Sequence, residues 1–342
     1  MIPVEDHGFY AEPLAAWSLT LDGNDLADKI NPRLISLRLS EKRGEEADTL
    51  EIVLHDSDNQ LAIPPDGARL NLALGWDRGT GMATGLVSKG SFKVDELTWS
   101  GPPDQLTITA RAADFHGSFR KRKTKIWNET TLGAIVNLIA TANGYTPRCH
   151  PDLADEEITQ AEQHNKSDMA FLRDLGRRYD AVATVKGGAL IFAPIDADTT
   201  ATGKPIPTAT ITRQSGDRYE YRRASRESRE DGASADWHDK HAGRRKTAHH
   251  GGNHRRKLKR VYASEKDAKA ASKSESKRCA RAAATFTITL AHGVAALAAG
   301  MKLKVEGFKS EVDKKTWRIA SVDHEMNATG GFTTSLELEV AG

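Results

Sequence analysis

Cysteine, long apolar runs and a targeting segment are scarce or missing in this chain. Of its 342 residues only Cys149 and Cys279 are cysteines, and they lack the paired spacing of a disulfide framework or a cysteine-based zinc site. No run approaches the roughly 18 to 20 apolar residues that cross a bilayer, and residues 1–10 contain acids where a signal peptide needs bases. We therefore expect idle thiols, no membrane contact and residence in a cytosol-like compartment.

The motifs of several enzyme classes are missing as well. The chain lacks the H-E-x-x-H helix of zinc proteases, the G-x-S-x-G elbow and the G-x-x-x-x-G-K-[ST] phosphate loop. Gly79, Gly81 and Gly85 resemble a dinucleotide fingerprint, but their spacing is wrong and no helix signal follows, which favours a hairpin loop. We expect no enzyme activity, no catalytic residue and no cofactor.

Histidines cluster in the second half of the chain and raise the question of a metal site. Imidazoles are common zinc ligands, but no cysteine lies among these residues, and the lysines and arginines between them disfavour a bound cation. The sequence therefore predicts a solvated basic loop without a metal. The histidines concerned are His238, His241, His249, His250 and His254.

The net charge of +2 hides two blocks of opposite sign. Residues 1–100 hold 17 acids against 9 Lys or Arg, and residues 218–260 hold 14 Lys or Arg against 6 acids. Such blocks can steer self-association or docking, and the basic one can also contact phosphates. A nucleic-acid-binding or regulatory protein that uses segment 240–260 is therefore an alternative hypothesis, although Trp237 alone lies near these charges, without a repeated aromatic platform.

Residues 34–112 carry mostly strand signals. Leucine and isoleucine alternate with polar residues around 50–54 and 70–74, the period-two pattern of half-buried strands. Residues 92–99 and 106–111 flank the sequence S-G-P-P-D at 100–104, whose glycine and prolines predict a turn and hence a hairpin. We expect an antiparallel, barrel-like domain over residues 1–118.

A different periodicity follows in residues 119–204. Apolar residues at helical spacing between 132 and 139 predict a helix that begins at Thr130 or Thr131 and ends near residue 143. A second helix is predicted to start at Ser167, and strands at 182–185 and 190–192 are joined through Gly187 and Gly188. These signals predict a small α/β module.

Strand signals return in residues 205–342, at 209–212, 286–290, 303–305 and 336–340. Ser264, with an acid three residues later, predicts the start of a helix over 264–284. Its apolar side is almost all alanine, so it lies on the surface or packs closely against a neighbour, and we assign it as exposed. Segment 230–256 is polar and almost free of aliphatic residues, which predicts a basic projecting hairpin or mobile loop that buries little.

The fold class predicted from these signals is β-rich α+β. Two β-barrel-like domains, residues 1–118 and 205–342, flank the α/β module at 119–204. The second barrel-like domain includes the basic segment 230–256 and the helix 264–284.

Short motifs follow one another along nearly the whole chain, at residues 48–54, 90–96, 101–104, 131–136, 163–172, 235–239, 262–264, 316–319 and 331–334. Each motif alone is weak, but their shared order is specific. Taken in this order, they resemble the phage late control D family, the baseplate hub proteins of contractile-tailed phages. Segment 230–256 departs from the family pattern because it is unusually rich in Arg, Lys and His.

The resemblance implies a homotrimeric ring in which two β-barrel domains per subunit give approximate six-fold symmetry, so that a three-fold spike can meet a six-fold tail tube. The expected partners are other copies of the chain, the central spike protein, the tail tube or tube-initiator protein and the baseplate wedge proteins. The tape measure protein is a further candidate, and neither membrane nor nucleic acid is expected. The expected location is the tail baseplate of a virion or tailocin particle, assembled in the cytoplasm of the bacterial host.

Two other protein classes resemble this family in part. The hub part of type VI secretion spike proteins is similar, but there a long β-helical needle usually continues the chain, whereas this chain stops at Gly342. A separate spike protein is therefore expected. Some tail hubs carry a peptidoglycan hydrolase domain, but no candidate pair of acid and nucleophile for glycoside hydrolysis can be placed in this sequence.

Overall fold

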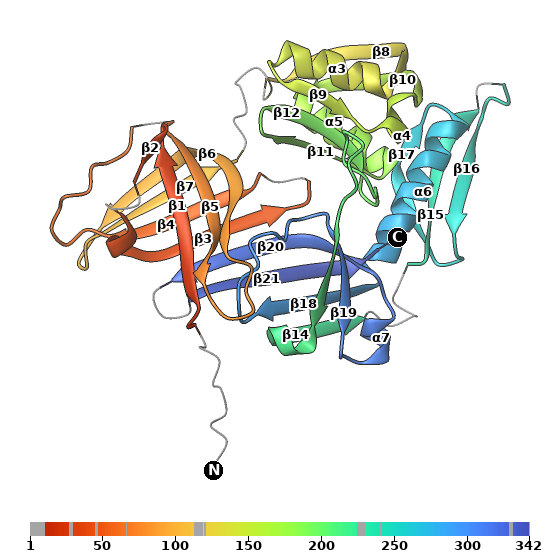
Figure 1. Ribbon diagram of the computed structural model, residues 1–342. Helices are drawn as coiled ribbons and strands as arrows, with labels where there is room; N and C mark the ends of the chain where they lie inside the picture. Colours follow the sequence, from red (N-terminus) through yellow and green to blue (C-terminus); the bar gives the residue numbers. More distant parts are fainter. Residues whose placement is uncertain are drawn as a thin grey trace.

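The computed structural model describes residues 11–26, 30–44, 47–65, 67–112, 119, 121–223, 230–239, 241–327 and 331–341. Within these residues a 13-stranded sheet forms the base of the molecule, and three smaller sheets and their helices lie beside it (Figure 1). The predicted β-rich α+β fold is confirmed.

The first β region forms one half of the 13-stranded sheet. Alternation of apolar and polar residues places Leu37, Leu39, Leu50 and Ile52 in its core, where they are fully buried. The predicted hairpin at 100–104 is confirmed. The elements are β1 (Leu14–Leu21), β2 (Asn24–Asp25), η1 (Asn31–Arg33), β3 (Leu34–Lys42), β4 (Thr49–His55), β5 (Arg69–Arg78), β6 (Gly85–Ser100) and β7 (Gln105–Arg111).

The last β region forms the other half of the same sheet. Phe286, Trp317, Ile319 and Leu338 are fully buried in a separate apolar cluster on this half. The elements are β13 (Thr208–Thr212), η2 (Arg213–Ser215), β14 (Gly216–Arg223), β18 (Ala284–Leu290), β19 (Lys302–Glu306), α7 (Ser310–Asp313), β20 (Trp317–Asn327) and β21 (Gly331–Val340).

The prediction of two barrel-like domains is wrong in one respect, because the two β regions form one open sheet. The 11-residue strand β20 pairs with β19 near its start and with β3 over the rest of its length, from Ser321 opposite Lys42 to Asn327 opposite Ser36. A strand that long carries the hydrogen-bond ladder from one half to the other. In the described part of the chain no ring of paired strands closes on itself.

The α/β module has the elements that the sequence predicts. The Thr131 hydroxyl accepts a hydrogen bond from the Ala134 N–H, and the Ser167 hydroxyl accepts one from the Ala170 N–H, so both predicted helix starts are confirmed. The elements are β8 (Lys123–Thr131), α3 (Leu132–Ala142), β9 (Thr146–Cys149), α4 (Pro151–Ala154), β10 (Glu157–Lys166), α5 (Asp168–Tyr179), β11 (Ala181–Lys186) and β12 (Ala189–Pro194).

Segment 230–256 and the helix after it form a small unit at one edge of the molecule (Figure 1). β15 (Gly232–Asp239) pairs with β16 (Arg244–Gly251) as a hairpin, and β17 (Arg255–Tyr262) adds a third strand beside β15. The predicted hairpin is confirmed. The interpretation that this segment buries little is wrong, because Ala235 and Ala248 are buried with Ala268 of α6 (Glu265–Arg281).

The assignment of this helix as exposed is likewise wrong, and the alternative of close packing is confirmed. α6 contacts β15 and α5, and its alanine and serine face is buried. Small side chains let the helix backbone approach its neighbours closely, so little apolar area does not mean exposure.

The division into domains at residues 118 and 204 stays a prediction. Residues 113–118, beside the first boundary, lie outside the described part of the chain.

Candidate functional site

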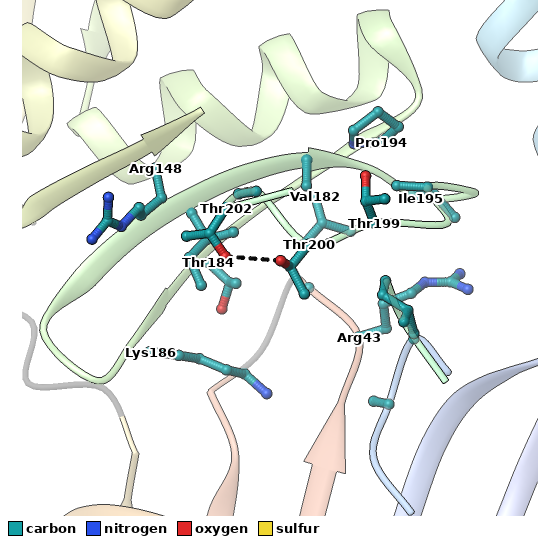
Figure 2. Close-up of a pocket in the computed structure, with 18 of the residues that line it drawn as sticks. Arg43, Arg148, Val182, Thr184, Lys186, Pro194, Ile195, Thr199, Thr200 and Thr202 are labelled. Atoms are coloured by element: carbon teal, nitrogen blue, oxygen red, sulfur yellow. Dashed lines mark hydrogen bonds between the residues drawn. The ribbon is translucent and has the colours of Figure 1, made fainter. Parts of the chain in front are cut away.

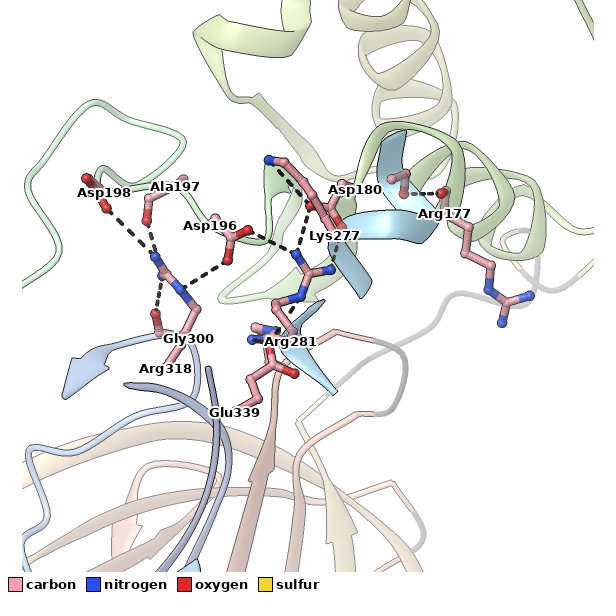
Figure 3. Close-up of polar contacts among 12 residues, drawn as sticks. Arg177, Asp180, Asp196, Ala197, Asp198, Lys277, Arg281, Gly300, Arg318 and Glu339 are labelled. Atoms are coloured by element: carbon pink, nitrogen blue, oxygen red, sulfur yellow. Dashed lines mark hydrogen bonds and ion pairs between the residues drawn. The ribbon is translucent and has the colours of Figure 1, made fainter. Parts of the chain in front are cut away.

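Buried charged side chains gather where the α/β module, α6 and the 13-stranded sheet meet. Arg281 at the end of α6 is only 2% exposed and donates hydrogen bonds to Asp180, which follows α5, at 2.9 Å and to Asp196, which follows β12, at 3.0 Å. Its Nε also lies 3.4 Å from Glu339 of β21. One guanidinium thus holds three separate parts of the chain together (Figure 3).

Arg318 of β20 extends this cluster of charged side chains. Its side chain is 1% exposed, and its Nη1 donates to the carbonyl oxygens of Ala197 at 3.2 Å and Gly300 at 2.7 Å. Its Nε lies 3.6 Å from Asp196, the carboxylate that Arg281 also contacts (Figure 3). We call this set, with Arg281, Asp180 and Glu339, the ionic junction.

The two arginines differ in their electrostatic surroundings. Burial works against the charge of Arg281, but the hydrogen bond and the charge of Asp180 outweigh it and raise the pKa of Arg281 above its usual value. Burial lowers the pKa of Arg318. Its carboxylate partners lie farther away and do not offset this effect, and the positive charge of Arg43 lowers the pKa further. A guanidinium stays charged in both cases, so the junction is ionic at neutral pH.

An apolar pocket of about 370 Å³ lies beside the junction, between the module and the 13-stranded sheet (Figure 2). One face of β11 and β12 packs against the module's helices, and the other face contributes Val182, Thr184 and Ile191 to the pocket. The loop that carries Thr199 and Thr200 lines another side. Ionic contacts therefore hold the module beside a cavity that apolar packing leaves open.

A larger groove of about 760 Å³ lies between the two halves of the 13-stranded sheet. Trp76 of β5 and Gly293 both line the groove, and Nε1 of Trp76 donates to the carbonyl of Gly293 at 2.8 Å. Val87 and Val294 line the groove and are 39% and 41% exposed. Exposed apolar residues of this kind suit an interface with another protein chain.

A buried polar group ties the two halves together at the seam between β3 and β20. His324 is fully buried, and its Nε2 lies 3.4 Å from Glu41, which accepts a hydrogen bond of 2.8 Å from Lys89 of β6. The hydroxyl of Thr334 accepts from the Val294 N–H and lies 2.9 Å from Nδ1 of His324, so it can donate to that nitrogen. When Thr334 donates to Nδ1, the proton of the neutral histidine is on Nε2, the nitrogen that lies near Glu41.

The basic segment presents exposed cations on β16 and β17. Lys257 contacts Asp236 at 3.0 Å, and the hydrogen bond from Lys246 holds the pKa of Asp239 at about 2. The aromatic rings of Trp237 and Tyr262 pack against the alanine cluster under α6 and do not stand on the outer face. In the described part of this sheet there is thus no exposed aromatic platform on which nucleic-acid bases could stack.

The histidines of this segment do not converge. His249 lies opposite Ser234 and His238 lies opposite Arg245, so they share a face but stand four positions apart along the ladder, roughly 13 Å at 3.3 Å per residue. His250 faces the other side. No group of three or more His, Cys, Asp or Glu side chains suited to a metal occurs among the described residues.

The other residues singled out in the sequence are the glycines of the dinucleotide-like motif and the two cysteines. Gly79 and Gly81 lie in the loop between β5 and β6, as predicted. Cys149 and Cys279 are free thiols, and burial raises the pKa of Cys149 to about 11, so it is protonated at neutral pH. No helix in the described ranges is long and apolar enough to cross a membrane.

The sequence interpretation missed the ionic junction and the seam. The one usable signal was the position of Arg318 between the apolar residues Trp317 and Ile319. At this point the alternation of buried and exposed residues along β20 is interrupted. Asp180 and Arg281 carry no such signal, because charged residues at helix ends are ordinarily exposed.

The chain was then compared with known proteins. Residues 49–330 match the phage tail baseplate hub (GPD) family. The probable baseplate hub proteins of Escherichia phages P2 and 186 are 37% and 35% identical to this chain, and each alignment covers 95% of this chain and 92% of the relative.

Solved structures share the fold at much lower identity. A tail protein from Neisseria meningitidis superposes with a TM-score of 0.68 at 11% identity, over 95% of this chain and 96% of that chain. A component of the Escherichia coli type VI secretion system gives a TM-score of 0.58 at 12% identity, over 95% and 77%. The resemblance noted in the sequence is confirmed, and the chain belongs to the phage tail baseplate hub family, as a structural component of the tail baseplate and not an enzyme.

Proposed function

We propose that three copies of the chain form a ring that joins a central spike to the tail tube of a contractile tail or tailocin. The observation that carries this proposal is the continuous sheet. Because β3 and β20 pair, each chain contributes two adjoining β regions, and three chains contribute six. Such a ring can match a three-fold partner on one side and a six-fold partner on the other.

We infer the partners from the family to which the chain belongs. The two halves of the 13-stranded sheet form the ring and present their edges to the first layer of the tube or its initiator. The α/β module lies on the side of the spike or the wedge proteins, and the tape measure protein is a further candidate within the ring. The groove with Val87 and Val294 offers an apolar surface for one of these contacts.

Electron microscopy of the purified chain, alone and with the spike protein of the same particle, tests the proposal. Class averages with three-fold symmetry in either sample support the ring. Particles of two or six copies, or single chains in both samples, contradict it. A variant with Val87→Asp and Val294→Asp should fold but lose one of the assembly contacts, whereas Ile63→Asp, at a position 66% exposed outside this groove, is the matched control.

A further inference from the structure

The two halves of the 13-stranded sheet repeat one pattern of strand pairing. Apart from the two-residue β2, the described chain has six strands in each half: β1, β3, β4, β5, β6 and β7, and then β13, β14, β18, β19, β20 and β21. In both halves the second strand pairs with the third, the third with the sixth, the sixth with the fifth, the fifth with the fourth and the fourth with the first. These pairs are antiparallel, except that β13 runs parallel to β19.

A β-bulge aligns the second strands of the two halves residue by residue. The register of β3 on β4 shifts just before Ser36, and the register of β14 on β18 shifts just before Arg218. Both shifts lie near the start of the strand, so Arg218 corresponds to Ser36. Counting on from this position, Tyr221 corresponds to Leu39.

A second bulge aligns the fifth strands. The register of β6 on β7 shifts just before Glu96, and the register of β20 on β21 shifts just before Ser321. In both halves the ladder to the fourth strand stops three residues before this bulge, which supports the same alignment. Counting on from the bulge, Trp99 corresponds to His324.

One pairing has no counterpart within the described chain. β3, the second strand of the first half, pairs with residues 321–327 of β20, the fifth strand of the second half. The corresponding strands are β14 and β6, and these two do not pair with each other. β14 forms one margin of the sheet and pairs with β18 alone (Figure 1). Residues 96–100 of β6 pair with β7 alone, so each strand has an edge open to another chain.

We propose that β14 of one copy pairs antiparallel with the open edge of β6 in the next copy, in the register of β3 on β20. This inference rests on the proposed trimeric ring and specifies the contact between its copies. Three pairings within chains and three between chains then repeat one geometry, so the six halves close a ring. The alignment places Tyr221 opposite Trp99 and Arg222 opposite Thr98.

The exposure of the corresponding side chains fits an absent partner strand. Where β3 and β20 pair, Leu39 and His324 lie opposite each other and both are fully buried. Their counterparts are not, because Trp99 is 56% exposed and Tyr221 is half-buried. Tryptophan and tyrosine are enriched at contacts between protein chains, where their large apolar area is covered. β14 of the next copy covers Trp99 as β3 covers His324.

Charge complementarity supports the same register. Where β3 and β20 pair, Arg38 lies two positions from direct opposition to Asp323 and forms an ion pair of 3.3 Å with it. The same diagonal offset brings Arg222 of β14 close to Glu96 of β6, since diagonal neighbours on one face are about 7–8 Å apart and long side chains span that gap. Both residues are exposed in the single chain, and they come from the basic and the acidic block of the sequence.

A pair of cysteines across the proposed contact tests its register. Thr98→Cys with Arg222→Cys places two thiols directly opposite each other, with Cβ atoms about 4.5–5.5 Å apart, close to the range that a disulfide spans. Oxidation should link three copies into a covalent trimer, measured on a non-reducing gel and by mass spectrometry. In the matched control, Thr98→Cys with Arg223→Cys, one thiol lies on the other face of the sheet. This control and the parent chain, with Cys149 and Cys279, should give about tenfold less of that product.

Light scattering of the same samples before oxidation separates this inference from the ring. A mass of three chains without the covalent trimer, or with equal amounts of it from both cysteine pairs, would overturn the strand pairing and leave the ring intact. Single chains in every sample, even with the spike protein present, would overturn both.

A second variant tests the contact without a crosslink. Trp99→Asp should weaken the association of copies by about tenfold or more, because it places a charge where the next copy excludes water. Ile63→Asp, at a site 66% exposed in the loop between β4 and β5, is the matched control and should leave association within about twofold. Sedimentation equilibrium measures both. Association of Trp99→Asp equal to that of the control would overturn the proposal.

Discussion

Arg281, in the last turn of α6, donates a hydrogen bond of 2.9 Å to Asp180, the residue that ends α5. The two residues are 101 positions apart, and both are buried. Through Asp196 and Glu339 the same guanidinium reaches the linker after β12 and the last strand of the 13-stranded sheet. The orientation of the module in the hub therefore depends on a buried ionic contact.

Loss of Arg281 should destabilise the chain strongly. Arg281→Ala leaves the buried Asp180 and the partly buried Asp196 with less compensating charge, which typically costs about 3–5 kcal/mol. Urea unfolding followed by circular dichroism measures the difference. Arg244→Ala, at an exposed position of β16, should change the free energy of unfolding by less than about 0.5 kcal/mol. Equal effects of the two substitutions would show that the ionic junction does not stabilise the fold.

The seam at His324 predicts sensitivity to acid. Burial lowers the pKa of His324 below its ordinary 6.5, more than the contact with Glu41 raises it, and the neighbouring Lys89 lowers it further. The unfolded chain therefore takes up a proton near pH 6.5 that the folded chain does not. The contribution of His324 to the free energy of unfolding is therefore fully present above about pH 6.5. It falls as the pH drops from there toward the pKa of His324 in the folded chain.

Glu41 adds to this loss at lower pH. Burial alone would raise its pKa, but the contact with His324 and the charge of Lys89 outweigh burial and lower it below 4.5. Its contribution is present above about pH 4.5 and is lost below it. Unfolding curves at about pH 7.5 and about pH 5.5 isolate the histidine. His324→Gln should reduce the difference between them and His249→Gln, on the exposed strand β16, should not; equal stability of the parent chain at both pH values would contradict the account.

Trp317 is predicted to be a main support of the second half of the sheet. It is fully buried, its Nε1 donates to the carbonyl of Val312 at 3.1 Å, and its ring lies 5.6 Å from that of Phe286. Trp317→Ala should lower the free energy of unfolding by about 3–5 kcal/mol through lost burial and a cavity. Ile63→Ala, at a site 66% exposed, is the control and should cost far less. A melting temperature unchanged by Trp317→Ala would refute the core position.

The small face of α6 is predicted to reject larger side chains. Ala268 is fully buried against Ala235 and Ala248, so Ala268→Leu should overpack this contact and cost about 1–3 kcal/mol. Ala280→Leu adds the same atoms at an exposed position of the same helix and should be nearly neutral. Thermal melts of the two variants measure the difference. A neutral Ala268→Leu would mean that the helix packs loosely on β15.

The sequence predicted those elements whose signal is local. The hydroxyls of Thr131, Ser167 and Ser264 mark helix starts because each satisfies an N–H three residues on. Alternation in β4 and β18 marked strands because one face of each is buried. Local signals of this kind do not depend on the rest of the fold.

The remaining features depend on distant parts of the chain. Pairing of Ser36 with Asn327 joins the two β regions, but the sequence of neither strand identifies the other as its partner. Alanines on α6 suggested exposure because the matching alanines of β15 and β16 could not be placed opposite them. Arg281 and Arg318 are buried only because carboxylates from other segments contact them. Those contacts are a property of the tertiary fold.

The trimeric ring is the central claim, and the molar mass of the purified chain by light scattering, at low and high salt, tests it most directly. The account predicts a mass of three chains at low salt and partial dissociation at high salt, since the acidic and basic blocks contribute to the contact. A mass of one chain at every salt concentration, together with a shift of DNA in a gel, would contradict the ring and favour the nucleic-acid hypothesis for segment 240–260.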